Sequence, residues 1–230
     1  MDLRNVVKDL KTQIDDFIEN NSTKELEFVF GRSIKPNNYY SKINKGLFQD
    51  LLRRLNSLDF QKDDIEQLDI IVNDSDIRAT LVGRQNIVLY CKENIDVLDN
   101  LTYDYKKPDA RKSHVEIVNY GIRSNLKVEI PIDNITDRSN ELTKKYNNLL
   151  DRTDSGTIYD LNKKFRYKKR ISYKTNDGFN IDLTVVKSNC GVCKSFKSSD
   201  LLNMNESYEV EIECDFNEIK QSNRNTDYIL

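Results

Sequence analysis

The stretch at residues 208–213 reads YEVEIE, with glutamate at every second position. Successive side chains of a β-strand point to opposite faces, so a strand over 207–216 carries Glu209, Glu211 and Glu213 on one face. Its other face is aromatic and apolar. Three carboxylates in a row repel one another unless cations lie nearby. The stretch therefore predicts a strand that faces a positively charged neighbour.

A second stretch supplies the opposite charge. Residues 163–170 read KKFRYKKR, and a strand over 164–174 aligns Arg166, Lys168 and Arg170 on one face. Solvated surfaces usually intersperse the two signs of charge. These two strands instead separate them, which favours an arrangement in which the acidic and basic rows face each other.

Other segments also alternate with a period of two residues, and their charged and polar positions fall on one face. These positions are Glu25 and Glu27 in strand 24–31, Arg123 and Glu129 in strand 121–130, and Asn180, Asp182 and Thr184 in strand 178–187, with Asp69, Arg78 and Lys112 on less regular strands.

Strands therefore dominate the expected secondary structure, with few helices. Helices are expected at 3–19 and 45–57, with a weaker one at 138–150 and a helical turn near 199–204. The expected strands are 24–31, 66–73, 76–83, 86–92, 101–106, 111–118, 121–130, 164–174, 178–187 and 207–216.

Composition narrows the class of protein. The chain has 230 residues, with 36 basic and 38 acidic side chains, which does not indicate a protein that coats nucleic acid. No apolar run has the length of a membrane span, and the N-terminus lacks the hydrophobic region of a signal peptide. Four cysteines do not form a disulfide scaffold, so a cytoplasmic, reducing setting is expected.

Three parts of the chain are expected. Residues 1–20 form a helix that packs on a barrel, residues 21–216 form the main domain, and residues 217–230 form a tail or a linker to a downstream domain of a larger chain.

Two architectures are compatible with these strands. In an open antiparallel sheet the charged faces would meet water, and for any single strand that is the simpler reading. A closed barrel with a charged interior accounts for all the strands together, because acidic and basic rows then face each other. The apolar faces would point outward, where the helices at 3–19 and 45–57 could cover them.

Such an interior has a chemical meaning. Several carboxylates on adjacent strands form an oxygen-only site suited to Mg²⁺ or Mn²⁺. Opposing arginine and lysine side chains form a phosphate clamp. A metal, cations and a positioned water are what phosphoryl transfer requires.

Motifs along the chain resemble those of the triphosphate tunnel metalloenzymes. The similarity is greatest to the RNA 5′-triphosphatase domain of fungal and giant-virus (mimivirus-type) mRNA-capping enzymes. The matching motifs are ELEFVFG at 25–31, DIR at 76–78, RSNLKVE at 123–129, RYKKRISY at 166–173, IDLT at 181–184 and YEVEIE at 208–213.

The resemblance implies a closed antiparallel eight-stranded β-barrel, or tunnel, of the α+β class with helices outside. It implies metal ligands at Glu25, Glu27 and Glu213, and a γ-phosphate clamp of Arg78, Lys168 and Arg170. It further implies that the attacking water is oriented by Glu129, Glu211 and Glu209. The other residues implied to line the interior and contact the substrate are Lys112, Arg123, Arg166, Asp182, Thr184 and Asp69.

The implied activity is metal-dependent removal of the γ-phosphate from 5′-triphosphate RNA, with hydrolysis of free NTP as a side activity. A guanylyltransferase domain is the expected partner. Two alternatives remain: a tripolyphosphatase or nucleoside triphosphatase on the same fold, and a non-catalytic barrel that binds polyanions. Val29 stands where thiamine-triphosphatase relatives carry lysine, which favours the capping branch, and Asn180 removes one expected cation.

Other catalytic patterns are missing. His114 is the only histidine, which excludes a histidine-based triad. No Gly-rich phosphate loop or K-x-D-G motif is present. Cys190 and Cys193 have the spacing of a metal site but lack a second pair.

Overall fold

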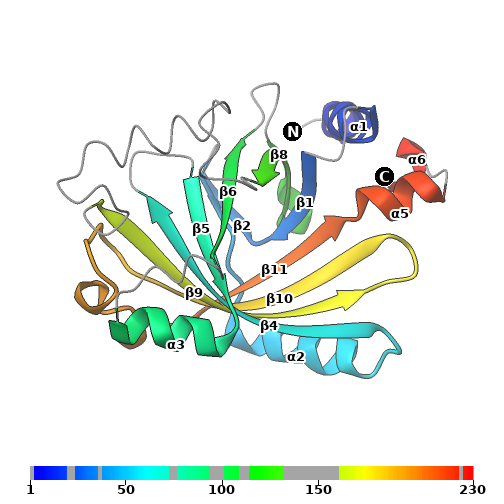
Figure 1. Ribbon diagram of the computed structural model, residues 1–230. Helices are drawn as coiled ribbons and strands as arrows, with labels where there is room; N and C mark the ends of the chain where they lie inside the picture. The colour runs from blue at the N-terminus through cyan, green and yellow to red at the C-terminus, as the bar shows by residue number, and fades with distance from the viewer. Residues whose placement is uncertain are drawn as a thin grey trace.

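Strands are the main elements of the described part of the chain, as the sequence predicts. The computed structural model describes residues 3–19, 24–35, 38–72, 77–93, 101–108, 114–131, 161–222 and 225–229. Figure 1 shows a strongly curved sheet with helices around it. The strands are β1 (Lys24–Phe30), β2 (Arg32–Lys35), β3 (Asn38–Tyr40), β4 (Gln61–Val72), β5 (Ile77–Val82), β6 (Leu101–Pro108), β7 (His114–Ile117), β8 (Ile122–Pro131), β9 (Lys163–Lys174), β10 (Phe179–Ser188) and β11 (Ser207–Cys214).

Helices begin, end and interrupt this series of strands. They are α1 (Leu3–Glu19), α2 (Lys45–Asn56), α3 (Arg84–Glu93), α5 (Phe216–Gln221) and α6 (Thr226–Ile229), with 3-10 turns η2 (Val118–Tyr120), η4 (Lys197–Ser199) and η5 (Leu201–Asn203). No helix in the described part of the chain is long and apolar enough to cross a membrane.

Pairing in the main sheet is antiparallel throughout the described ranges. The strand order is β1-β11-β10-β9-β4-β5-β6-β8-β7, and β1 pairs with β8 as well as with β11. The series of pairings therefore returns to its first strand. β6 and β7 pair with different parts of β8, β6 along Lys127–Pro131 and β7 along Ile122–Asn125. The predicted α+β class with an antiparallel sheet is confirmed, and the sheet has nine strands in the described ranges because β6 and β7 both pair with β8.

The apolar faces of the strands pack outward against helices. On α1, Ile14 and Phe17 bury Leu26 of β1 and Leu126 of β8. Phe48 of α2 packs on Tyr173, Leu183 and Val210 of β9, β10 and β11. The start of α2 is fixed by Asn44, whose side chain accepts a hydrogen bond from the backbone N–H of Leu47 at 2.8 Å. Both predicted helices therefore cover the sheet as expected.

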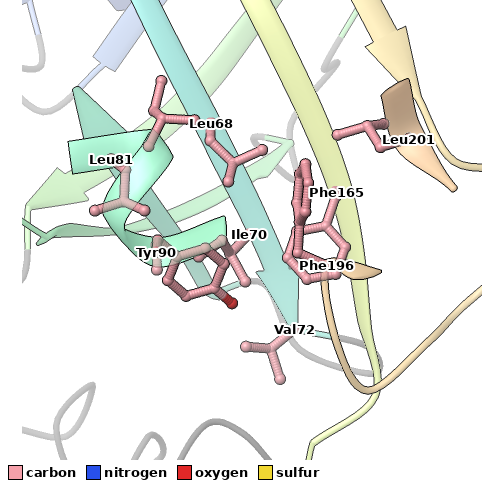
Figure 2. Packing of buried hydrophobic residues seen from close by; sticks show 10 residues of the cluster. Leu68, Ile70, Val72, Leu81, Tyr90, Phe165, Phe196 and Leu201 are labelled. Atoms are coloured by element: carbon pink, nitrogen blue, oxygen red, sulfur yellow. The ribbon is translucent and has the colours of Figure 1, made fainter. Parts of the chain in front are cut away.

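A third apolar cluster lies beneath β4, β5 and β9 (Figure 2). Phe165 lies at its centre, with its ring 5.7 Å from Phe196 and 6.4 Å from Tyr90 of α3. Leu68 and Leu81 are fully buried beside it. This packing directs the charged faces of β4, β5 and β9 to the other side of the sheet.

One predicted strand is wrong, because residues 86–92 lie in α3. Ile87 and Tyr90 are buried at helical spacing, whereas the intervening Val88 and Leu89 are largely exposed. Gly83, with φ +89°, ends β5 and lets the chain turn into this helix. The predicted helix at 138–150 lies outside the described residues.

The C-terminal segment is also more ordered than the predicted tail. Asp215 caps α5 by accepting hydrogen bonds from two backbone N–H groups. Ile219 is buried in the cluster that contains Phe17, and Thr226 of α6 donates a hydrogen bond to Asp15 of α1. The segment therefore packs against α1 rather than extending from the sheet. Two further elements were not predicted, the short hairpin β2–β3 and the first five residues of β4.

Candidate active site

The basic row lies on β9, as its alternation predicts. Arg166, Lys168 and Arg170 share the face opposite Phe165, and all three line one cavity of about 590 Å³. Lys168 is the most buried of the three, with 4% of its surface exposed. β5, which pairs with β4 on the side away from β9, adds Arg78 to the same cavity. The predicted clamp of Arg78, Lys168 and Arg170 is therefore brought together.

The acidic row lies on β11 and lines the same cavity. Glu209, Glu211 and Glu213 all face it, opposite the buried Val210. Only β10 separates β11 from β9, and the two rows meet across it. One Nη of Arg166 donates to both carboxylate oxygens of Glu209, at 2.9 and 3.1 Å.

Arg170 links the basic row to two carboxylates. Its Nη1 lies 3.0 Å from Asp182 Oδ2 on β10, and its Nη2 lies 3.8 Å from Glu211 Oε2 on β11. Asp182 also accepts a hydrogen bond from Ser172 at 2.6 Å. These contacts hold the guanidinium between the two rows.

Lys168 is held by a carboxylate from the other neighbouring strand. Its Nζ lies 2.5 Å from Asp69 Oδ2 on β4, and Arg78 Nη1 lies 3.8 Å from the same oxygen. The other oxygen of Asp69 accepts hydrogen bonds from Gln67 at 3.0 Å and Thr80 at 3.4 Å. Asp69 is thus the fixed anchor of the clamp.

Burial and charge shift the pKa of several of these groups. Burial lowers the pKa of Lys168 to about 8, because desolvation and the neighbouring arginines outweigh the attraction of Asp69. Burial alone would raise the pKa of Asp69, but Lys168 and Arg78 hold it below its usual value. Burial also raises the pKa of Glu211, and Glu27 reinforces this effect. Perturbed groups that share one cavity are typical of active sites.

Two further acidic side chains line the cavity from β1. Glu25 and Glu27 lie on its inner face, and Glu27 is directly opposite Glu213 of β11. Glu27 accepts hydrogen bonds from the Nζ of Lys127 and, at 2.8 Å, from Asn125. Glu129 of β8 also lines the cavity.

These residues can be tested for their fit to a divalent metal. Glu25, Glu27 and Glu213 offer only oxygen ligands from paired strands, which suits Mg²⁺ or Mn²⁺. No three acidic, histidine or cysteine side chains of the described residues converge as metal ligands. The ammonium of Lys127 instead lies against Glu27. The three carboxylates therefore suit a hard cation in their chemical type. The ammonium of Lys127 places a positive charge beside one of them.

Several predicted residues lie apart from the main cavity. Asp182 lines a smaller cavity beside Arg170 and Asn180, and Thr184 is buried on the same face of β10. Arg123 stacks its guanidinium on the ring of Tyr39, 4.7 Å from its centroid. Lys112 lies outside the described residues.

Some lining residues were missed by the sequence analysis. Lys127 lies two positions before Glu129 on the same face of β8, so alternation alone could have found it. Thr80 and Gln67 share their faces with Arg78 and Asp69, but neutral side chains gave no charge signal. Lys24 and Phe216 border the cavity at its end.

Comparison with solved structures shows that the chain has the fold of a capping-enzyme triphosphatase. The resemblance drawn from the motifs is confirmed at this level. No family model and no curated protein matches the chain.

The particular structures come from mimivirus. The chain is 19% identical to the mimivirus capping enzyme triphosphatase in its triclinic form, with a TM-score of 0.63, covering 95% of this chain and 93% of that one. The monoclinic form gives a TM-score of 0.62 at the same identity and coverage. The RNA triphosphatase domain of a trifunctional mimivirus mRNA capping enzyme is 18% identical, with a TM-score of 0.57, covering 96% and 95% of the two chains.

Proposed function

We propose that this chain is a metal-dependent RNA 5′-triphosphatase, which hydrolyses the γ-phosphate of a triphosphate-ended RNA inside a closed tunnel. One observation carries the proposal: rows of glutamate and of arginine and lysine face each other across one cavity of about 590 Å³. A binding site for anions alone would need only the basic row. The acidic row supplies what hydrolysis needs in addition.

Strand pairing supports the tunnel. β1 is bonded to β11 on one side and to β8 on the other, so neither edge of β1 is left open along its paired length. The apolar faces are already covered outside by α1, α2 and α3. A closed tunnel would enclose the charged faces together, where a low dielectric strengthens their interaction with a phosphate chain.

The basic row can act as the phosphate clamp. Arg78 and Arg170 each carry a buried Nε that has no hydrogen-bond partner among the described residues. Such donors are costly to bury unless a ligand satisfies them, and phosphate oxygens are suitable acceptors. Lys168, fixed by Asp69, adds a third positive charge. The three cations would stabilise the charge that develops on the transferred phosphoryl group.

The acidic row can place the attacking water. Glu129, Glu211 and Glu209 border the cavity, and the raised pKa of Glu211 favours it as a proton acceptor. Glu25, Glu27 and Glu213 would hold a Mg²⁺ or Mn²⁺ ion, which would neutralise negative charge on the phosphate chain. Water would then attack the γ-phosphorus in line, and the products would be a diphosphate RNA end and inorganic phosphate.

The RNA substrate and the capping role rest on the structural neighbours. The chain shares its fold with the RNA triphosphatase domain of a trifunctional mRNA capping enzyme along nearly its whole length. Free NTP would be a second substrate. A guanylyltransferase would use the diphosphate end, either as a fused domain or as a separate partner, in the cytoplasm or in a virion.

Phosphate release from triphosphate-ended RNA tests the proposal. Glu25→Gln and Glu213→Gln each remove the negative charge of one proposed ligand and should lower the rate about 100-fold or more. Glu206→Gln is the matched control, because Glu206 is exposed just before β11, where it accepts a hydrogen bond from the hydroxyl of Tyr208 at 3.0 Å. An undiminished rate in both ligand variants would contradict the proposal, and binding without turnover would favour a polyanion-binding barrel.

A further inference from the structure

Two segments of the chain are positively charged although the chain as a whole is slightly acidic. The whole chain has more acidic than basic residues, yet residues 31–49 contain Arg32, Lys35, Lys42 and Lys45 and no Asp or Glu. The segment 118–127 likewise contains no acidic residue. Two regions far apart in the sequence thus share a local excess of positive charge.

The fold brings these two segments into contact. The backbone N–H of Gly31 donates to the carbonyl of Gly121 at 2.8 Å. A Cβ on Gly31 would lie 2.0 Å from the carbonyl oxygen of Tyr40, and one on Gly121 would lie 2.4 Å from that of Gly31. The hydroxyl of Tyr39 lies within hydrogen-bond distance of the carbonyls of Val29 and Gly121. The β2–β3 hairpin is therefore fixed against the turn before β8.

Two tyrosine rings remain exposed on this surface. Tyr40 is 42% exposed and Tyr120 is 73% exposed. Arg32 lies 5.4 Å and Lys42 lies 6.0 Å from the centroid of the Tyr40 ring. We call these four residues, Arg32, Tyr40, Lys42 and Tyr120, the aromatic-basic face.

The aromatic-basic face lies at one end of the charged cavity. Arg123 pairs with Val29, which in turn pairs with Glu211, so the hairpin that follows β1 continues past the acidic row toward Glu209. The backbone of Ile43 bonds that of Tyr208, the residue before Glu209. Arg123, which stacks on Tyr39, lies on the same face of β8 as Lys127, which lines the cavity.

We propose that the aromatic-basic face binds the single-stranded RNA that follows the 5′-triphosphate. Exposed aromatic rings beside cations are the usual means of holding single strands, since bases stack on the rings and cations bind the phosphates. The inference rests on the proposed function for the position of the triphosphate end. It goes further in assigning the nucleotides of the RNA to a surface outside the catalytic cavity.

Binding of RNA without a triphosphate tests the face separately from catalysis. The probe is a fluorescent single-stranded RNA of about 12 nucleotides with a 5′-hydroxyl end, measured by anisotropy. Replacing both tyrosines (Tyr40→Ala with Tyr120→Ala) should weaken binding about tenfold. Replacing both cations (Arg32→Gln with Lys42→Gln) should reduce the slope of log affinity against log salt by about 1.4.

Matched controls make the outcome specific. Tyr228 on α6 has the same exposed fraction as Tyr40, 42%, and lies on the C-terminal helix, so Tyr228→Ala should leave RNA binding unchanged. Arg53→Gln with Lys62→Gln removes the same charge from α2 and β4. If loss of Tyr40 disturbs the hairpin, Tyr120→Ala alone should still weaken binding, because its ring is mostly exposed. Unchanged binding in the tyrosine variants, or an equal loss in the controls, would overturn the proposal.

Catalytic rates provide a second test of the RNA-binding surface. The ratio of kcat/KM for triphosphate-ended RNA to that for free GTP should fall about tenfold in the double tyrosine variant and stay constant in Tyr228→Ala. If no triphosphate is hydrolysed at all, the proposed function fails and the anisotropy result alone decides the RNA site. If polyglutamate competes with RNA and its binding is lost in the same variants, the face binds acidic protein and the proposal is wrong.

Discussion

The Nζ of Lys168 lies 2.5 Å from the Oδ2 of Asp69, and both side chains are buried on adjacent strands. Asp69 has no exposed surface, and Gln67 and Thr80 donate to its other oxygen. A buried carboxylate with these partners fixes the ammonium at one point of the cavity. Two properties of the protein follow from this pair, its pH dependence and part of its stability.

Activity should fall as the pH rises through about 8. Burial lowers the pKa of Lys168 to about 8, with Asp69 opposing and Arg78, Arg166 and Arg170 reinforcing the shift. Below that pH the free protein has a charged clamp, and above it the lysine becomes neutral. The pH profile of kcat/KM should show this loss. In Lys168→Arg the fall near pH 8 should disappear, and its persistence there would contradict the assignment.

Removing Asp69 should destabilise the fold strongly. Asp69→Ala leaves the buried ammonium of Lys168 without its partner, and the free energy of unfolding should fall by about 3–5 kcal/mol. Urea denaturation measures this change. Asp64→Ala on the same strand is the control, because the pair of Asp64 with Lys62 is exposed and worth less than about 1 kcal/mol. Similar losses in both variants would show that Asp69 is not a special anchor.

Lys127 should compete with the metal. Its ammonium lies against Glu27, one of the proposed ligands, so Lys127→Gln removes a like charge from the metal site. The Mn²⁺ concentration for half-maximal binding, measured by electron paramagnetic resonance, should fall several-fold. Lys24→Gln is the comparison, because Lys24 borders the cavity but pairs with Asp16 at 2.6 Å. Weaker Mn²⁺ binding in Lys127→Gln would contradict the prediction.

The first helix should be an integral part of the fold. Phe17 of α1 has no exposed surface, and its ring lies edge-on to Phe216 of α5 at 5.6 Å. Phe17→Ala should lower the free energy of unfolding by about 3–5 kcal/mol. Val7→Ala, at a position on α1 that is 51% exposed, should change it by less than about 0.5 kcal/mol. If truncation of Phe17 costs no more than truncation of Val7, α1 is only an attached segment.

Alternation along single strands predicted which side chains share a face. It placed Arg166, Lys168 and Arg170 together, and it placed Glu209, Glu211 and Glu213 together. It also predicted that the helices at 3–19 and 45–57 cover the apolar faces. These features follow from local geometry, because the spacing of apolar residues along the chain shows whether a segment has the period of a strand or of a helix.

Partners across strands could not be predicted in the same way. The pairing of Lys168 with Asp69 and of Lys127 with Glu27 depends on which strands become neighbours and in what register. Helix α3 was not predicted because the exposed residues Val88 and Leu89 are also apolar. They obscure the helical spacing of the buried residues, and the run of apolar residues resembles a strand. The β2–β3 hairpin is too short to show a clear alternation.

Release of inorganic phosphate from 5′-triphosphate RNA, measured with and without a divalent metal, tests the central claim most directly. The opposed rows in one cavity predict one phosphate released per RNA end when Mg²⁺ or Mn²⁺ is present. Release should stop with excess chelator and return when the metal is restored. Release that continues undiminished in chelator, or no release with either metal from the correctly folded protein, would contradict the account.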